Sequence, residues 1–203
     1  MPFGMCKPGP DCTVKPNAGW AKMPEVITGF SQTHVSGTGG GQKYGNILIQ
    51  PGVNPQKRTN EEFALGYYAT TFESGIRTEI TTSDRCAFYR IHYPKAGSLL
   101  IDATHYLGKN PVPDLREQQQ FIGGEVEIVS DNEVRGYSRV RGGWNNGDAY
   151  TVYICLISDK PFKQKGENFV EFADTLLNIK VGISYVSEQQ AKRNIPSCDF
   201  DTQ

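Results

Sequence analysis

The chain has 203 residues, and its 22 glycines and 12 prolines make up about a sixth of them, which favours turns over long helices. Its 21 basic and 22 acidic side chains give a net charge of −1, so no polycationic surface is available for a nucleic-acid backbone. No apolar stretch approaches the roughly 20 residues that a membrane span needs, and the opening MPFGMCKPGP lacks the features of a signal peptide. A chain of this length buries one sizeable core, so we expect a single domain over residues 1–203.

Hydrophobic residues alternate with polar ones from residue 44 onward, in short runs that Gly, Pro, Asn and Asp separate, and this pattern is typical of β-strands. Strands are predicted, in chain order, at residues 44–50, 63–72, 76–81, 87–93, 98–106, 125–130, 134–141, 150–158 and 176–187. The Ser-Asp-Arg sequence at residues 83–85 predicts a hairpin between the third and fourth of these strands. The strongest alternation is that of Leu177, Ile179, Val181, Ile183 and Tyr185.

A single helix is predicted, close to the end of the chain. Ser187 is followed three residues later by Gln190, which is the pattern of a capping box, and the polar segment 188–194 then runs to Pro196. Many antiparallel strands of similar length with almost no helix favour two sheets packed face to face. The sequence therefore predicts an all-β fold, an antiparallel β-sandwich with one short C-terminal helix.

The five cysteines form no C-x-x-C pair, and none lies at zinc-ligand spacing from the three histidines, so a structural zinc site is not expected. Their odd number and wide separation favour buried small side chains over a disulfide framework. Cys6 and Cys12 are close enough in sequence to meet across a turn. The cysteine pattern fits both an oxidising and a reducing compartment.

Polar side chains crowd onto a glycine-rich backbone at residues 29–41, which read GFSQTHVSGTGGG. Such a loop can approach a ligand closely, and its hydroxyl, amide and imidazole groups suit the many hydroxyls of a sugar. The candidate binding residues are Gln32, Thr33, His34, Ser36, Gly37 and Thr38. A flexible connection without a ligand is the alternative, since loops carry such residues anyway. The spacing of a phosphate-binding loop is absent.

The two tryptophans of the chain, Trp20 and Trp144, are further candidates for sugar binding. Trp144 belongs to the loop RGGWNNG at residues 141–147, where it can offer a flat apolar face to a pyranose ring. The alternative is a ring folded back over the edge of the sandwich.

The residues themselves give catalysis little support. His34 has no serine–aspartate or cysteine partner that the sequence identifies, and His92 and His105 lie in strand patterns, where packing or solvent exposure is the ordinary explanation. Glu125 and Glu127 share one strand face at a separation of about 7 Å, which suits an inverting glycosidase. Alternate glutamates between valine and isoleucine are also what a solvated strand face looks like, and this second interpretation is favoured.

Longer stretches of the sequence resemble a known family. The segment GFSQTHVSGTGGGQKYGNI at residues 29–47 closely resembles the most characteristic motif of the N-terminal domain of glycoside hydrolase family 92, the exo-acting α-mannosidases. Further similar stretches follow in order, and the resemblance covers essentially the whole chain. They are PFGM at 2–5, GYY at 66–68, GIRTEITTSDR at 75–85, SLLID at 98–102, GGW at 142–144 and VGISYVSEQQAKRN at 181–194.

This resemblance implies a two-domain enzyme, in which an N-terminal sandwich of the galactose-mutarotase-like supersandwich type packs on a larger (α/α) helical barrel. It also implies calcium-dependent, inverting hydrolysis of α-linked mannose, α-1,2 linkages foremost, with a glutamic acid protonating the leaving oxygen and an aspartate activating water. In the family, those carboxylates and the main calcium ligands belong to the barrel. We therefore expect no catalytic residue and no calcium site in this chain. Its expected partners are the missing barrel and an α-mannoside glycan.

By the same resemblance the chain is a fragment, because family members continue into the barrel and begin before the PFGM motif. The intact enzyme is expected to be periplasmic or secreted, and the pairing of Cys6 with Cys12 is the disulfide expected in that case, with Cys86 and Cys155 free. Three functions remain in competition. The first is the non-catalytic half of an α-mannosidase that contributes substrate-binding loops and a docking face, the second is an autonomous carbohydrate-binding module, and the third is a purely structural partner domain.

Overall fold

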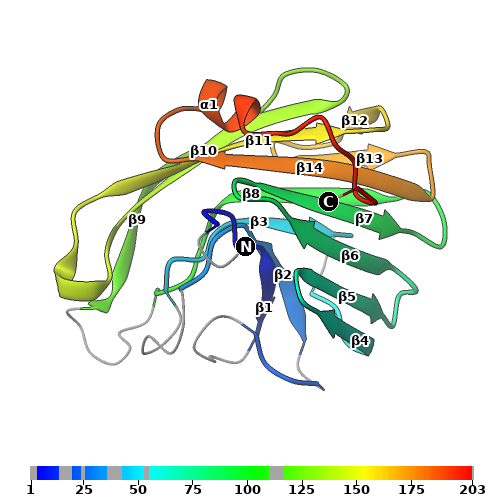
Figure 1. Cartoon of the computed structure of the whole chain (residues 1–203), viewed down its shortest axis with the longest axis horizontal. Helices are drawn as coiled ribbons and strands as arrows, with labels where there is room; N and C mark the ends of the chain where they lie inside the picture. Colours follow the sequence, from blue (N-terminus) through cyan, green and yellow to red (C-terminus); the bar gives the residue numbers. More distant parts are fainter. Residues whose placement is uncertain are drawn as a thin grey trace.

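Two antiparallel β-sheets packed face to face make up the protein, as the computed structural model shows (Figure 1). The structure describes residues 4–13, 20–23, 26–35, 43–52, 55–109 and 117–202. One short helix, α1 (Glu188–Arg193), lies against the larger sheet near the end of the chain. The predicted all-β sandwich with a single C-terminal helix is confirmed.

The smaller sheet has six strands and the larger sheet eight. The six-stranded sheet runs in the order β1 (Gly9–Cys12), β2 (Ile27–Ser31), β3 (Asn46–Pro51), β8 (Ser98–Tyr106), β13 (Phe169–Phe172) and β12 (Phe162–Gln164). The eight-stranded sheet runs in the order β4 (Arg58–Ala64), β5 (Tyr67–Phe72), β6 (Arg77–Thr82), β7 (Cys86–His92), β14 (Leu176–Ser184), β11 (Tyr150–Ser158), β10 (Glu133–Gly142) and β9 (Gln119–Ile128). In Figure 1, β9 and β10 form a long hairpin that extends to the left.

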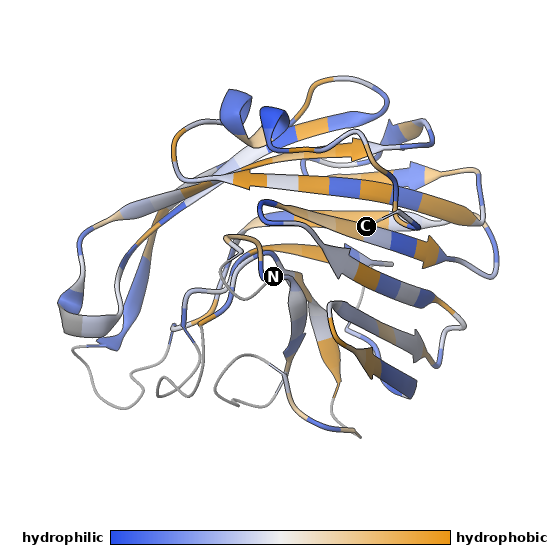
Figure 2. Cartoon of the chain, viewed as in Figure 1, coloured by the Kyte–Doolittle hydropathy of each residue, from blue (hydrophilic) through white to orange (hydrophobic). Residues whose placement is uncertain are grey.

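The core lies between the two sheets, and hydrophobic residues concentrate on the strands that enclose it (Figure 2). The alternation on β14 shows how the sequence builds this core. Leu177, Ile179, Val181 and Ile183 are each at most 1% exposed, whereas Tyr185 lies beyond the end of the strand and is exposed. Period-2 alternation puts every second side chain on the buried face, so the local pattern is sufficient to orient the strand.

Local signals predict most of the longer elements correctly. The strands expected at 98–106 and 150–158 match β8 and β11, and residues 83–85 connect β6 to β7 as a hairpin. The helix begins as a capped helix, because the hydroxyl of Ser187 accepts a hydrogen bond from the backbone N–H of Gln190 at 3.1 Å. Gly182 on β14 lets this helix pack directly on the strand, since a Cβ there would lie 2.2 Å from the carbonyl oxygen of Ala191.

The prediction of one strand over residues 63–72 is wrong. Two strands, β4 and β5, meet there in a hairpin in which Ala64 pairs with Tyr67, and the turn between them depends on Gly66, whose φ is 75°. The apolar run continues through this turn, so the pattern hides it. The last predicted strand also ends earlier than expected, at Ser184.

The expected pairing of Cys6 with Cys12 is also wrong, because neither residue forms a disulfide. The residues between them extend as β1 instead of forming a turn, and the two thiols face different neighbours. Cys6 Sγ lies 3.8 Å from the carbonyl oxygen of Gln32, and Cys12 Sγ accepts the backbone N–H of Ala21 at 3.2 Å. Cys86 and Cys155 are free and buried in strands, as expected. Among the described residues, no helix is long and apolar enough to cross a membrane.

Candidate functional site

The described part of the glycine-rich loop starts where β2 ends and resumes just before β3. Residues 32–35 follow Ser31, and residues 43–45 lead into Asn46. The candidates Ser36, Gly37 and Thr38 lie outside the described residues. The base of the loop is therefore held between two neighbouring strands of the six-stranded sheet.

Two of the candidate binding residues, Gln32 and Thr33, point into the protein. The amide of Gln32 is fully buried and donates hydrogen bonds to the carbonyl of Phe30 and to the hydroxyl of Tyr89, both at 2.8 Å. The hydroxyl of Thr33 donates to the carbonyl of Tyr44 at 2.6 Å and accepts the backbone N–H of Asn46 at 3.1 Å. These two side chains support the loop from beneath.

The third described candidate, His34, belongs to a buried cluster around the carboxylate of Asp11 on β1, which is 1% exposed. His34 Nε2 lies 2.8 Å from Asp11 Oδ1, and its Nδ1 lies 2.8 Å from the carbonyl oxygen of Lys7. His105, at the end of β8, donates from Nε2–H to Asp11 Oδ2 at 2.7 Å, and the hydroxyl of Ser31 donates to the same oxygen. We call these four side chains, Asp11, Ser31, His34 and His105, the Asp11 cluster.

Charge explains why the Asp11 cluster holds together. Burial alone would raise the pKa of Asp11, but the two histidines outweigh it and keep that pKa well below its usual range. Burial lowers the pKa of His34, but the charge of Asp11 and the hydrogen bond to it outweigh this effect, so the pKa is raised. The cluster is no catalytic triad, because Ser31 donates to the carboxylate and not to an imidazole.

The sequence alone does not predict the Asp11 cluster. Its strand pattern predicts only packing or solvent exposure for the His105 side chain. The structure joins His105 to Asp11 across 94 positions of sequence, through the strand order β1-β2-β3-β8. No local pattern marks either residue, so only the topology of the sheet brings them together.

A second set of contacts ties the loop to the eight-stranded sheet. Gln119, at the start of β9, accepts the backbone N–H of Tyr44 at 2.7 Å and donates to the hydroxyl of Tyr150 at 3.2 Å. Tyr150 in turn donates to the side-chain oxygen of Asn46 at 2.8 Å. This network fixes Tyr44 in a left-handed backbone conformation, with φ at 60°.

Tyr44 also positions the candidate Trp144, which is 42% exposed. The hydroxyl of Tyr44 accepts the backbone N–H of Trp144 at 2.7 Å, and the two rings meet edge to face with centroids 5.4 Å apart. Trp144 is the first residue of a short 3₁₀ helix, η2 (Trp144–Asn146), which follows Gly143 directly. The last residue of η2, Asn146, has a left-handed backbone with φ at 51°. Backbone in such sparsely populated conformations clusters at functional sites. Trp144 is thus an exposed ring on a rigid support beside the loop.

A cleft of about 510 Å³ lies at the loop that carries Trp144, and Gly142, Asn146 and Gly147 of this loop belong to its lining. Its lining is rich in planar polar side chains, which are Gln118, Gln120, Arg141, Asn146 and Asp148. Arg141 is held in place by two hydrogen bonds from its guanidinium to Gln120 Oε1, at 3.0 and 2.7 Å. The two glutamines of this cleft belong to the run of three at residues 118–120.

Trp20 lies in different surroundings. Its indole N–H donates to Glu61 Oε1 on the edge strand β4 at 3.0 Å, and its ring meets Phe63 edge to face at 5.9 Å. The same carboxylate accepts hydrogen bonds from Tyr68 and from the buried Arg58. Trp20 and Phe63, with Leu65 at the hairpin tip, leave apolar surface in solvent, at 40%, 62% and 104% exposure. We call these three residues the β4 patch.

The carboxylates Glu125 and Glu127 are both exposed on β9, while Val126 and Ile128 between and after them pack toward the core. The interpretation as a solvated strand face therefore agrees with their surroundings. Among the described ranges, no group of three or more His, Cys, Asp or Glu side chains is arranged to hold a metal ion.

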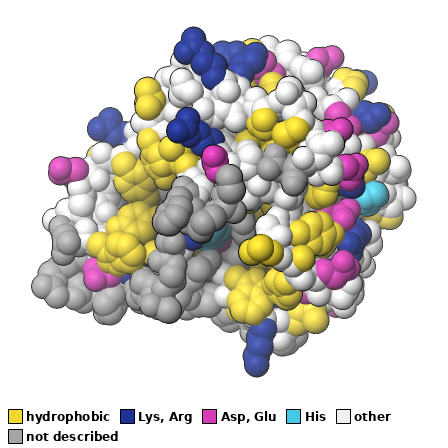
Figure 3. Space-filling view, viewed as in Figure 1, with side chains coloured by type: hydrophobic (Ala, Val, Ile, Leu, Met, Phe, Trp, Pro, Cys, Tyr) yellow, Lys and Arg dark blue, Asp and Glu magenta, His cyan; other side chains and the backbone are white. Residues whose placement is uncertain are grey.

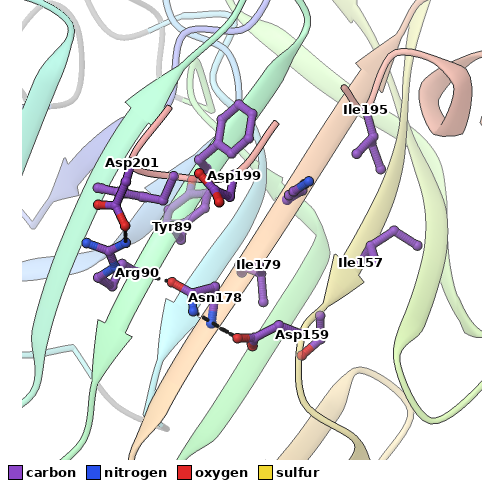
Figure 4. Close-up of a pocket in the computed structure, with 13 residues that line it drawn as sticks. Tyr89, Arg90, Ile157, Asp159, Asn178, Ile179, Ile195, Asp199 and Asp201 are labelled. Atoms are coloured by element: carbon purple, nitrogen blue, oxygen red, sulfur yellow. Dashed lines mark hydrogen bonds and ion pairs between the residues drawn. The ribbon is translucent and has the colours of Figure 1, made fainter. Parts of the chain in front are cut away.

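A further cavity, of about 450 Å³, lies on the outer face of the eight-stranded sheet, under the segment that follows α1 (Figure 4). Two pairs of polar side chains drawn there contact each other. Arg90 forms a 2.7 Å ion pair with Asp201 and lies 4.4 Å from the centre of the Phe200 ring, and Asn178 donates to Asp159 at 2.8 Å. These contacts strap the end of the chain onto β7 and β14.

On the face shown in Figure 3, hydrophobic side chains gather in separate areas, and acidic, basic and histidine side chains lie together toward the right. This charged area agrees with the ion pairs on the outer face of β6 and β7, where Arg77 meets Glu62 at 2.9 Å and His92 lies 3.4 Å from Glu79. The outer surface of these strands is therefore a network of paired charges.

Comparison with known proteins gives one matching family. Residues 1–170 match the glycosyl hydrolase family 92 N-terminal domain. A protein of Arthroderma benhamiae described as an uncharacterized secreted glycosidase is 30% identical over 265 aligned residues, covering 99% of this chain and 33% of that protein. This chain thus spans about a third of the length of that relative.

Solved structures share the fold. A family GH92 α-mannosidase from Bacteroides thetaiotaomicron aligns with a TM-score of 0.77 and 22% identity, over 95% of this chain and 32% of its own. A family GH92 inverting mannosidase from the same species aligns with a TM-score of 0.73 and 19% identity, over 99% of this chain and 30% of its own. The first of these enzymes has also been solved with mannoimidazole, and that structure aligns with a TM-score of 0.78. At these identities the likeness is one of fold.

Proposed function

The chain belongs to glycosyl hydrolase family 92, as an N-terminal domain of that family, and from this we propose that it is the non-catalytic β-sandwich half of a calcium-dependent, inverting exo-α-mannosidase. In this proposal the loop at residues 29–41, with Trp144 and its cleft, shapes the sugar site. The β4 patch serves as the docking face for an (α/α) helical barrel that carries the catalytic groups. The fungal relative is described as secreted, and we extend this to a periplasmic or secreted location for the whole enzyme.

The observation that carries the proposal is the rigid presentation of the exposed Trp144 ring on a loop whose neighbouring residues line a cleft with amide and charged groups. A pyranose has a flat face of C–H groups and a rim of hydroxyls, so it is bound by one aromatic face together with several planar hydrogen-bonding side chains. Tyr44 holds the Trp144 backbone at 2.7 Å, and Gln120 fixes Arg141 in the cleft wall. Neither group has to be ordered when the sugar arrives.

The placement of Glu125 and Glu127 explains why the proposal assigns catalysis to another part of the enzyme. An inverting glycosidase holds an acid and a base on opposite faces of the sugar, roughly 6.5–9.5 Å apart. Glu125 and Glu127 project from one face of β9, so both would approach a sugar from the same side. Calcium takes six to eight oxygen ligands, and in this proposal the barrel supplies most of them.

An autonomous carbohydrate-binding module is the second candidate function. The observation that favours it is the lining of the described cleft, where Gln118, Gln120, Arg141, Asn146 and Asp148 offer the amide and charged groups that bind sugar hydroxyls. The observation that favours docking is the β4 patch, because exposed large apolar side chains grouped on an edge strand mark interaction surfaces.

Calorimetric titration with α-1,2-mannobiose separates the two functions. The chain is titrated alone and with the helical domain supplied in trans, and Trp144→Ala is compared with Trp20→Ala as a matched pair of tryptophan variants. We expect measurable binding only when both domains are present, lost in Trp144→Ala through the sugar site and weakened in Trp20→Ala through docking. Binding by the chain alone that only Trp144→Ala removes would establish the module. Absence of binding in every combination would refute both.

A further inference from the structure

We infer that Asp11 and His34 are positioning residues for the sugar-binding loop, and that they lock the base of the loop in place only while His34 carries a proton on both ring nitrogens. The consequence of this inference is that the affinity for a glycan depends on pH, and this consequence rests on the proposed function. The lock itself concerns only contacts within this chain.

The geometry places His34 between two strands and the N-terminal segment. The backbone N–H of Lys7 donates to the carbonyl of Gln32 at 3.0 Å, and the carbonyl of Lys7 accepts from His34 Nδ1–H at 2.8 Å. The other ring nitrogen reaches Asp11 on β1 at 2.8 Å. The imidazole contact and the backbone hydrogen bond together fix residues 32–34 against Lys7.

Both partners of the imidazole are acceptors. A backbone carbonyl has no hydrogen to give, and an ionised carboxylate has none either. A neutral imidazole carries one N–H, so it can satisfy one of the two partners and must turn a bare nitrogen toward the other. The arrangement with both contacts made needs an imidazolium. When His34 loses this proton, either the contact with Lys7 or the contact with Asp11 opens.

The remaining members of the cluster do not need a second cation. His105 can reach Asp11 Oδ2 as a neutral ring with its proton on Nε2, and Ser31 donates to the same oxygen through a hydroxyl. One imidazolium at His34 therefore balances the single negative charge of Asp11. A buried charge without such a partner is costly, so the cluster favours the protonated form of His34.

The charged and titratable groups around His34 come from three elements. Asp11 on β1 raises the pKa of His34, the ammonium of Lys7 in the preceding segment lowers it more weakly, and His105 at the end of β8 faces the shared carboxylate. From β2 and β3 the described groups nearby, Ser31 and Asn46, do not titrate in the relevant range. The burial of the ring also lowers this pKa, but Asp11 prevails and the net direction is upward.

The first test is NMR of the 203-residue chain with its histidines labelled with ¹⁵N. The chain has three histidines, so each ring can be assigned and its nitrogens followed with pH. We expect both nitrogens of His34 to be protonated below its titration midpoint, and this midpoint to lie above that of a free imidazole and to fall in Asp11→Asn, with His92, outside the cluster, as the internal control. We also expect the protection of the Lys7 amide against hydrogen exchange to drop as His34 deprotonates. Deprotonation of His34 that leaves the protection of the Lys7 amide unchanged would overturn the lock, and this outcome does not require any variant to fold.

The second test is glycan affinity against pH, with the helical domain present. We expect the affinity for α-1,2-mannobiose to fall by up to about tenfold across the titration of His34, the factor that one hydrogen bond is worth, and to lose this pH dependence in Asp11→Asn. A flat wild-type profile would overturn the coupling of the lock to binding. Failure to bind glycan at any pH would instead refute the proposed function, and the NMR result would still decide whether the lock exists.

Discussion

The substitution Gly143→Ala is a severe test of how Trp144 is supported. Gly143 has φ at 90° and ψ at −150°, a conformation that is essentially restricted to glycine and costs other residues of order 1–3 kcal/mol. A Cβ at this position would also lie 2.3 Å from the hydroxyl oxygen of Tyr44 and 2.7 Å from its ring carbon Cζ. Relieving that contact displaces the ring that accepts the Trp144 backbone N–H.

Overpacking of this kind costs about 1–3 kcal/mol. Because the backbone strain and the contact with Tyr44 relax together, we expect a total loss of about 3 kcal/mol of unfolding free energy. A domain of this size loses roughly 2–4 °C of melting temperature per kcal/mol, so Tm should fall by about 6–12 °C. The emission and the indole N–H signal of Trp144 should change with it, because Tyr44 no longer packs against the ring.

Gly123→Ala is the matched control. Gly123 lies on β9, where an added Cβ meets no atom within 4 Å and no left-handed φ is required. This variant should keep the wild-type stability within about 0.5 kcal/mol. Thermal and urea unfolding of both variants, followed by fluorescence, make the comparison. Equal stabilities of Gly143→Ala and Gly123→Ala, with unchanged Trp144 signals, would refute the role given to Tyr44.

Three other predictions concern stability and thiols. Gly182→Ala should lose about 1–3 kcal/mol in urea unfolding, because the new Cβ would clash with the carbonyl of Ala191 and lift α1 from β14; an unchanged midpoint would contradict this packing. The lowered pKa of Asp11 stabilises the fold above about pH 4 and is lost as the pH falls, and the raised pKa of His34 stabilises it below about pH 6.5 and is lost as the pH rises. Stability should therefore be highest between these two values, with a flatter profile in Asp11→Asn. All five cysteines should react in the denatured, unreduced protein, and a lower count would reveal a disulfide.

Periodicity and capping are local properties, and the elements that they define were predictable from the sequence. The alternation on β14 and the Ser187–Gln190 capping box each need only neighbouring residues, and both appear in the structure as expected. The short strands β1, β12 and β13 have three or four residues each, which is too few for a period to show. They form because neighbouring strands, β2 for β1, β8 for β13 and β13 for β12, offer backbone partners, and this information is not local.

The candidate site was predictable in its residue types more than in its contacts. Trp144 and the polar loop were identified by composition, and the structure supports an exposed ring there. Gln32 and Thr33 were proposed to face a ligand, yet their hydrogen bonds run inward to Tyr89 and Tyr44. Side-chain direction at the end of a strand depends on what packs beneath it, so composition alone does not determine it.

The contacts of the Asp11 cluster are even less predictable from the sequence. Asp11, His34 and His105 belong to three separate segments, and nothing in the spacing of 23 and 94 positions between contacting pairs suggests that they meet. The order β1-β2-β3-β8 brings them together, and this order follows from packing of the whole sandwich.

Hydrolysis of an aryl α-mannoside and of α-1,2-mannobiose, in the presence of calcium, tests the central claim most directly. The purified chain, the helical domain and an equimolar mixture of the two are assayed side by side. We predict no turnover by the chain alone and faster turnover by the mixture than by the helical domain, because the chain contributes the loop and Trp144 but no opposed pair of carboxylates. Turnover by the chain alone that persists through purification and disappears in Glu125→Gln or Glu127→Gln would contradict the assignment of this chain as the non-catalytic half of the enzyme.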